Sequence, residues 1–224
     1  GMIVHKSLLY AVAANKLYSV TTAGTATERG TLSTSTGRIG ITAIDNEIII
    51  TDGTAGYTYV VSTATFAIIT DVDYNDAAEV CTAQDGYFLV AKPSSDQFYI
   101  SAVDNGQSWV STQFASAEGH YDLLVSLISV KRNLYLIGET TTEVWFNSGA
   151  TIPFERINNV FIDKGCAAKF TVAQVGDSIM WLAMNSQGNS EIVKLDGFDI
   201  TTVQNRGIQY RMGKHTTISD AFAF

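Results

Sequence analysis

The sequence predicts an all-β protein, and three observations support this prediction. Apolar and polar residues alternate in runs of about five to eight, separated by turn residues such as Asn147-Ser148-Gly149 and Gly176-Asp177. Residues that favour strands (Thr, Val, Ile and Tyr) are abundant, whereas proline occurs only 2 times in 224 residues. The hydrophobic content of 46% is enough for a sizeable core. Alternation at period two indicates short antiparallel strands and disfavours helices.

One strand pattern recurs along the chain. Each copy is a short apolar strand followed by a polar turn, and successive copies start 39, 39, 47 and 45 residues apart. The five copies are Leu8 to Val12, Glu47 to Thr51, Gly86 to Val90, Asn133 to Ile137 and Ser178 to Leu182. A spacing of about 40 to 50 residues is typical of the four-stranded blades of a β-propeller. The sequence therefore predicts a propeller of about five blades.

In each predicted blade a lead-in strand precedes the apolar strand and two strands follow it. We expect one propeller domain over residues 1–224, with Gly1 a scar of tag cleavage. The expected blades span residues 4–32 plus 217–224, 38–70, 78–114, 123–161 and 169–204. The first repeat lacks a lead-in strand before Leu8, and the chain ends on an unmatched one at 217–224. We therefore expect the C-terminal strand to pair into the N-terminal blade and close the ring; a piece of a larger propeller is the alternative.

The charge balance bears on partners. The chain carries 14 basic and 22 acidic residues, a formal net charge of -8, which disfavours a module that grips DNA through its phosphates. No run approaches the about 20 apolar residues of a membrane-spanning helix. The two cysteines, Cys81 and Cys166, are expected to be buried free thiols, because they form neither a zinc pattern nor a disulfide framework.

One turn motif raises the question of an enzyme. Asp104, Gly106, Ser108 and Trp109 resemble an Asp-box, a turn between the outer strands of a propeller blade in which the Trp packs beneath the loop. Sialidases carry several such boxes, but their chemistry needs an arginine cluster and a Tyr nucleophile paired with a Glu. The six arginines show no repeated placement on the lead-in strands. We therefore expect a structural turn.

Other candidate sites are weaker. His5, His120 and His215 are isolated from one another and from any Cys, so a metal site is not expected. The acidic run from Asp71 to Asp76 lacks the central Gly and the final Glu of a calcium loop. No nucleophile elbow, phosphate loop or dinucleotide fingerprint is present. The expectation is a protein without catalytic residues, metal or cofactor.

Three segments carry a family resemblance. Gly138 to Asn147 (GETTTEVWFN), Pro153 to Ile157 (PFERI) and Lys164 to Ala168 (KGCAA) resemble the packaged-DNA stabilisation proteins of short-tailed bacteriophages, which are tail accessory or hub proteins. The resemblance covers most of Val80 to Asp196. The positions to which it assigns a candidate assembly role are Glu139, Glu143, Trp145, Pro153, Phe154, Arg156, Gly165 and Cys166.

The resemblance implies a non-enzymatic component of a phage or prophage virion, made in the bacterial cytoplasm. Its implied partners are the portal or adaptor proteins, the tail needle and further copies of itself in a ring that extends the tail channel and helps to retain packaged DNA. DNA would at most pass through the channel, and no membrane is involved. Two alternatives stay open: a propeller module that binds a protein or a glycan, and a divergent sialidase-like enzyme that acts on glycans.

Overall fold

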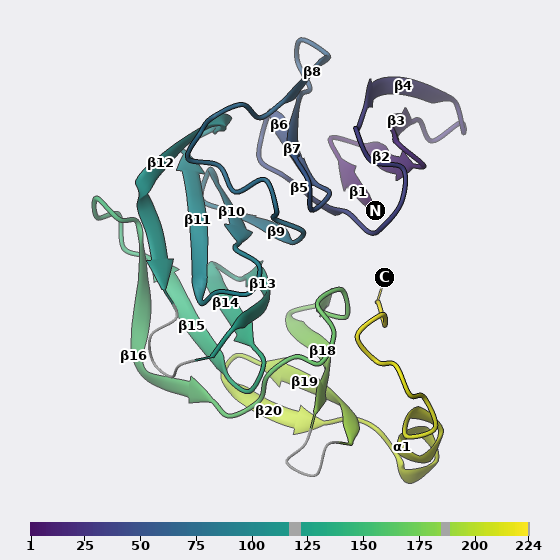
Figure 1. Ribbon diagram of the computed structural model, residues 1–224, viewed down its shortest axis with the longest axis vertical. Helices are drawn as coiled ribbons and strands as arrows, with labels where there is room; N and C mark the ends of the chain where they lie inside the picture. The colour runs from purple at the N-terminus through teal and green to yellow at the C-terminus, as the bar shows by residue number, and fades with distance from the viewer. Residues whose placement is uncertain (117–121, 185–188, 224) are drawn as a thin grey trace. The chain divides into compact units, whose positions relative to one another are not determined.

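The computed structural model describes residues 1–116, 122–184 and 189–223. Their regular structure is almost entirely strand, and the strands form five antiparallel sheets of four (Figure 1). The predicted propeller repeat of about five four-stranded blades is therefore confirmed. The chain divides into two compact units, which we describe separately: unit 1 is Gly1–Pro93 with Phe98–Phe114, and unit 2 is Ser94–Gln97 with Ala115–Phe224.

Each blade is a meander of four strands that are consecutive in the sequence. Unit 1 holds three blades: β1 (Met2–His5), β2 (Leu8–Ala13), β3 (Lys16–Val20) and β4 (Ala26–Thr31); β5 (Gly40–Ala43), β6 (Glu47–Thr51), β7 (Gly56–Val60) and β8 (Thr65–Ile68); β9 (Cys81–Gln84), β10 (Tyr87–Ala91), β11 (Gln97–Ala102) and β12 (Asn105–Ser116). Unit 2 holds two: β13 (Leu124–Val130), β14 (Asn133–Gly138), β15 (Thr142–Asn147) and β16 (Phe154–Ile162); β17 (Ala173–Val175), β18 (Ser178–Met184), β19 (Ser190–Asp196) and β20 (Asp199–Thr202).

Strand β6, the second strand of its blade, shows why such strands have continuous apolar sequences. All five of its residues are buried, because successive side chains point to opposite faces of the sheet and both faces are covered. Ile48 and Ile50 belong to a core that includes residues of the first blade, such as Tyr10. Ile49 belongs to a second core that includes Phe88 of the third blade. Neighbouring blades of unit 1 thus pack face to face through the middle blade.

Two-residue turns set the register of the first hairpin in several blades. Lys6-Ser7, Asp85-Gly86 and Lys131-Arg132 all have positive φ at both positions. That conformation belongs to type I′ turns, whose twist matches that of the flanking strands. The pairings His5 with Leu8, Gln84 with Tyr87 and Val130 with Asn133 follow directly from these turns.

The core of unit 2 lies between its two blades. Tyr135, Ile137 and Val144 of the fourth blade share one buried cluster with Trp181 and Val193 of the fifth. The Trp181 indole also donates a hydrogen bond of 2.9 Å to the backbone oxygen of Gly165. This core is the support on which the family-like segments of residues 138–168 are built.

The structure corrects the expected pairing of residues 217–224. Met2–His5 is the lead-in strand of the first blade, pairing with β2 from Met2 opposite Ala11 to His5 opposite Leu8. Gly1 continues this edge, since its oxygen accepts a hydrogen bond from the Val12 nitrogen (3.0 Å). Phe222 instead forms an isolated parallel bridge with Phe170. The repeat count missed Met2–His5 because it is a strand of only four residues, MIVH, in which two residues are exposed and apolar residues do not alternate with polar ones.

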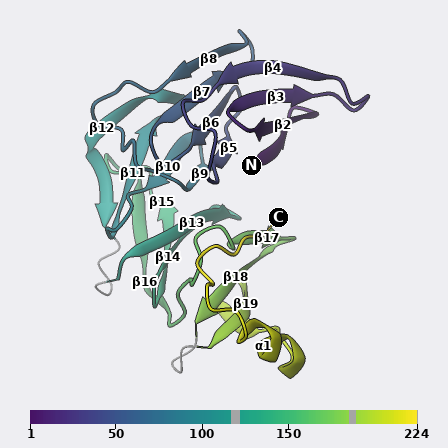
Figure 2. The same ribbon diagram turned by 45° about the vertical axis from the view of Figure 1, so that its right-hand side comes forward.

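A helix that the sequence analysis did not predict follows the last blade. Helix α1 (Arg206–Met212) lies next to β19 (Figure 2). It begins after Asn205, whose side chain accepts a hydrogen bond from the Ile208 nitrogen at 2.9 Å. It ends at Gly213, whose nitrogen donates to the Gln209 oxygen at 2.9 Å. Seven residues with no buried side chain leave no apolar periodicity to detect.

Candidate functional site

The turn between β14 and β15, residues 138–141, begins the GETTT segment and lies directly over Asp122. The Asp122 carboxylate accepts backbone hydrogen bonds from Glu139 (3.1 Å), Thr140 (2.9 Å) and Thr141 (2.7 Å). It also accepts the Thr141 hydroxyl at 2.9 Å. Asp122 is only 8% exposed, so these donors replace the water that a carboxylate would otherwise hold. The carboxylate therefore fixes the turn from beneath.

Two glycines let other chain segments approach this turn. A Cβ atom at Gly138 would overlap the Asp122 carboxylate, and a Cβ at Gly165 would overlap the backbone of Glu139 and Thr140. The nitrogen of Cys166 donates to the Gly138 oxygen (2.8 Å). The KGCAA segment is therefore packed directly on the GETTT turn, and both belong to one structural element.

Glu143, Trp145 and Arg156 come together on one side of the fourth blade. Trp145 Nε1 donates to Glu143 Oε2 at 2.9 Å, and Arg156 Nη1 lies 3.7 Å from Glu143 Oε1. A register irregularity between Glu143 and Trp145 places Arg156 directly opposite Trp145. Glu143 is 2% exposed, and Trp145 and Arg156 are polar partners of its buried carboxylate. Its contacts are internal to the blade.

The remaining family-like positions also point inward. Pro153 and Phe154 are buried, and the Pro153 oxygen closes the β15–β16 loop by accepting a hydrogen bond of 2.7 Å from the Ser148 nitrogen. Cys166 is buried, and burial raises the pKa of its thiol although hydrogen bonds with Thr171 and Ala168 act in the opposite direction. A raised pKa lowers the fraction of the thiolate form, which is the nucleophilic form of cysteine. Of the eight family-like positions, only Glu139 and Arg156 have exposed side chains.

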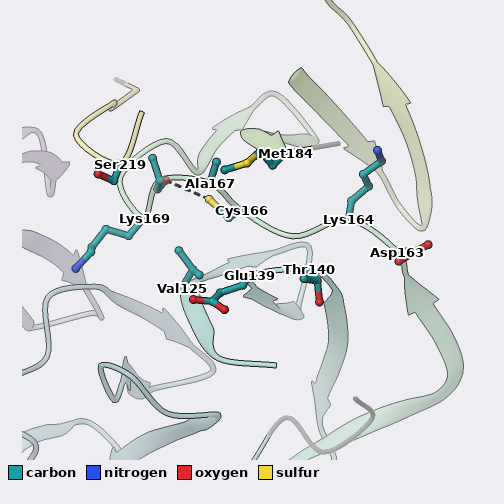
Figure 3. A pocket seen from close by; sticks show the side chains of 11 residues that line it. Val125, Glu139, Thr140, Asp163, Lys164, Cys166, Ala167, Lys169, Met184 and Ser219 are labelled. Atoms are coloured by element: carbon teal, nitrogen blue, oxygen red, sulfur yellow. Dashed lines mark hydrogen bonds between the residues drawn. The ribbon is translucent and has the colours of Figure 1, made fainter. Parts of the chain in front are cut away.

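A groove of about 770 Å³ lies beside this element (Figure 3). Glu139, Thr140 and Val125 line one side, and residues 166–169 line the other. Lys164, at one end, forms an ion pair with Glu191, which is 8% exposed. Lys169 and Ser219 complete the other end. The groove presents side chains of both charges.

The Asp-box-like turn lies in unit 1, between β11 and β12. Trp109 is 3% exposed; its indole donates to the Gly106 oxygen (2.8 Å), and its ring meets that of Tyr74 at a centroid distance of 5.0 Å. Asp104 takes a positive φ of 52° in the turn, and its nitrogen donates to the Gly86 oxygen at 2.8 Å. Ser108 is half-buried in β12. These residues fasten the third blade.

Two acidic residues, to which the sequence analysis assigned no role in this turn, hold the same region. Glu47, which is 6% exposed, accepts the Gly106 nitrogen at 2.7 Å from the neighbouring blade. Burial raises the pKa of the Glu47 carboxyl, with the nearby Asp104 charge adding to the effect and hydrogen bonds from Gly106 and Thr58 opposing it. Asp71 accepts the Trp109 nitrogen at 2.9 Å. A charged residue within an otherwise apolar strand, as in EIIIT, is the sequence signal that could have identified Glu47.

The weaker candidates have ordinary structural positions. The Asp71 to Asp76 run forms a turn, with Asp71 accepting the Asp73 nitrogen at 3.0 Å. His5 contacts the backbone oxygen of Asp45 (3.0 Å), His215 is exposed, and His120 lies outside the described residues. Both cysteines are free. Across residues 1–116, 122–184 and 189–223, no group of three or more His, Cys, Asp or Glu side chains is arranged to hold a metal ion.

The GETTT and PFERI segments lie in the fourth blade, and the KGCAA segment packs on its GETTT turn. Residues 2–221 match the family described as "Bacteriophage P22 Gp10, beta-propeller", a phage stabilisation family. The chain belongs to this family. Since the match spans nearly the whole chain, the first 70 residues, which the sequence analysis related only to generic propeller repeats, are included.

Other comparisons concern the fold alone. No curated protein sequence matches the chain. Among solved structures, a virginiamycin B lyase from Staphylococcus aureus superposes with a TM-score of 0.61 at 13% identity, covering 92% of this chain and 69% of the lyase. A protein named YjhT superposes with a TM-score of 0.61 at 10% identity, covering 91% of this chain and 82% of YjhT. At such identities only the propeller architecture is shared.

Membership of the P22 Gp10 family supports a structural role in a phage particle. A family of phage stabilisation proteins suggests a structural role and not an enzymatic one. Within the part of the chain that the structure describes, no helix has the length and apolar character needed to span a membrane.

Proposed function

We propose that this member of the P22 Gp10 family is a non-catalytic tail accessory or head-completion protein, which extends the tail channel and helps to retain packaged DNA. The match of residues 2–221 to a phage stabilisation family is the observation that carries the proposal. Its partners would be the portal or adaptor proteins, the tail needle and further copies of itself in a ring.

The charge of the chain fits this role. With 22 acidic and 14 basic residues, the protein repels phosphate overall, and a channel that must release DNA works best without tight phosphate contacts. We therefore expect the isolated chain to bind duplex DNA weakly and with a shallow dependence on salt. Fluorescence anisotropy with a labelled duplex, measured across a salt series, checks this expectation; tight binding with a steep salt slope would contradict it.

Genome retention is the decisive measurement. In the phage or prophage that encodes the chain, deletion of its gene should yield heads that package DNA and then lose it, so that empty particles accumulate. Quantification of nuclease-protected DNA, together with electron microscopy of particles, reports this directly. Complementation in trans by the wild-type gene is the control. Particles that keep their DNA but fail to adsorb to cells would instead favour a propeller module that binds a protein or glycan.

Glu139 allows a point test of assembly, because its side chain is exposed in the groove whereas most family-like residues are internal. We expect Glu139→Lys to fold normally and to lower the yield of DNA-filled particles. Asp177→Lys, which changes a side chain that is 76% exposed in a turn of the fifth blade, is the matched control for the charge change. Equal yields of DNA-filled particles from the two variants would show that Glu139 is not part of the assembly surface.

A further inference from the structure

Helix α1 is an anomaly in unit 2 because none of its seven residues is buried. Isolated helices shorter than about 12 residues are marginal in water, and most helical stability in proteins comes from packing of an apolar face. Here the large apolar side chains are open to solvent: Ile208 is 41% exposed and Tyr210 is 67% exposed. The capping residues Asn205 and Gly213 nevertheless stabilise the helical conformation of α1.

The segment around α1 has a charge opposite to that of the rest of the protein. Residues 205–219 contain Arg206, Arg211 and Lys214 and no acidic residue. The other 11 basic residues and all 22 acidic residues lie outside this segment. Lys214 Nζ lies 4.4 Å from the centre of the Tyr210 ring, so that a cation and an aromatic side chain are presented together.

The composition of this segment favours a protein partner over DNA. Exposed Tyr and Ile side chains interleaved with Arg are typical of the centres of protein interfaces, where Tyr and Arg are enriched among the residues that contribute most of the binding energy. A phosphate-binding helix needs the cations but gains nothing from exposed apolar side chains. The partner surface should therefore be acidic at its rim and apolar at its centre.

Unit 1 has a surface of this kind. A groove of about 410 Å³ lies at the turns between β5 and β6 and between β11 and β12. Its lining includes three acidic residues, Asp45, Glu47 and Asp104, and no basic one, while Ile44 and Val60 supply the apolar part. Asp45 also pairs with Lys6 at 3.2 Å, an exposed contact of little energy that a competing cation could replace.

We propose that α1 docks in this acidic groove of a second copy of the chain. Because the two surfaces differ, the contact is head-to-tail, and head-to-tail contacts generate closed rings when the rotation between copies closes. The inference rests on the proposed function for the role of such a ring in the tail, but the contact itself is measured on the purified chain.

Self-association is the first test. We expect analytical ultracentrifugation of the chain at low salt to show reversible association across micromolar concentrations. Arg206→Glu with Arg211→Glu and Lys214→Glu should weaken it by about tenfold or more, as should Ile208→Gln with Tyr210→Ser, because both variants remove interface-centre contacts. Far-ultraviolet circular dichroism checks that the blades remain folded in each variant.

The matched control reverses three cations outside α1: Lys16→Glu, Lys131→Glu and Lys194→Glu. Each belongs to an exposed ion pair of small energy, so the control reproduces the change in net charge without touching α1. We expect it to associate much more strongly than the α1 variant. Equal loss in both would show that net charge alone governs association and would overturn the proposal.

The groove is tested from the other side. Asp104→Asn with Glu47→Gln should weaken association to a similar degree, since Asn tolerates the positive φ of position 104 and Gln can keep the hydrogen bond to Gly106. A zero-length carbodiimide cross-linker should join Lys214 to Asp45 or Asp104. In a mixture of light and ¹⁵N-labelled chains, cross-linked peptides of mixed label identify contacts between copies.

Several outcomes would overturn the proposal: a chain that remains monomeric at all concentrations, association that is indifferent to α1, or cross-links found only within one copy. Loss of duplex DNA binding in the α1 variant, with association unchanged, would identify a nucleic acid as the partner instead. Failure of the proposed function would look different, because deletion particles would then retain their DNA even though α1-dependent association is intact.

Discussion

The carboxylate of Asp122 lies 2.7 Å from the backbone nitrogen of Thr141, nineteen residues further along the chain, and also accepts the Thr141 hydroxyl. In the second blade Asp52 plays a similar part from within its own loop, accepting the nitrogens of Thr54 (3.0 Å) and Ala55 (2.8 Å). Both carboxylates fasten the turn that follows an inner strand. The fourth blade, however, takes its carboxylate from a distant segment, which ties that segment to the turn.

Asp122→Ala should destabilise unit 2 by about 2–4 kcal/mol, because it leaves three backbone nitrogens and a hydroxyl without their acceptor in a buried position. Chemical denaturation followed by the fluorescence of Trp145 and Trp181 measures the change in the free energy of unfolding. Asp177→Ala, at a side chain that is 76% exposed, is the control and should change it by less than about 0.5 kcal/mol. Similar effects of the two substitutions would mean that the Asp122 contacts contribute little.

Gly165→Ala should destabilise unit 2 strongly, by about 2 kcal/mol or more, because the added methyl group overlaps the backbone of Glu139 and Thr140. The backbone would have to separate, weakening the hydrogen bond from Cys166 to Gly138. Thermal unfolding by calorimetry reports the loss. Gly213→Ala provides the comparison, since its Cβ would meet other atoms only at 3.4 Å or more and its φ of -64° suits alanine.

Arg156→Ala should cost about 1 kcal/mol, since it removes the cation 3.7 Å from a buried carboxylate but from a side chain that is itself 38% exposed. Glu143→Leu should cost more, about 2–3 kcal/mol, because the buried Trp145 indole then loses its acceptor. Denaturant unfolding of both variants, with Asn158→Ala on the same strand as control, tests this order. A larger loss of stability in Arg156→Ala than in Glu143→Leu would show that the ion pair between Arg156 and Glu143 contributes more than the hydrogen bond between Trp145 and Glu143.

Glu47 should make the stability of unit 1 depend on pH. Burial raises the pKa of its carboxyl above the ordinary 4.5, so the folded state binds the proton more tightly than the unfolded state. The stabilisation from this group is complete below pH 4.5 and is lost as pH rises through the higher folded value. Glu47→Gln should lack this decline. Hydrogen exchange of the Gly106 amide, followed from acid to neutral pH in both proteins, gives a local readout; parallel profiles would contradict the assignment.

The blade architecture could be predicted from the sequence, because the four strands of each blade and the turns between them are neighbours along the chain. Strands such as EIIIT are covered on both faces and read as apolar runs, and two-residue turns such as Asp85-Gly86 punctuate them at short range. The family resemblance was also visible in GETTTEVWFN, PFERI and KGCAA, because each of these segments is continuous in the sequence. The short strand at Met2–His5 was missed because its four residues show no alternation of apolar and polar side chains. Helix α1 was missed because it has no buried face.

The roles of the family-like residues depend on contacts between segments that are distant in the sequence. Glu143 and Trp145 stand two apart in the sequence, but the position of Arg156 beside them depends on an irregular register that no local pattern records. Asp122 and Gly165 flank the turn at 138–141 from opposite directions along the chain, and their roles follow from close approach of backbones. Periodicity in the sequence indicates which face of a strand is buried. The hydrogen-bond donors of a buried carboxylate such as Asp122 come from a distant segment, and periodicity does not indicate which one. The roles of these residues could therefore be read only from the folded chain.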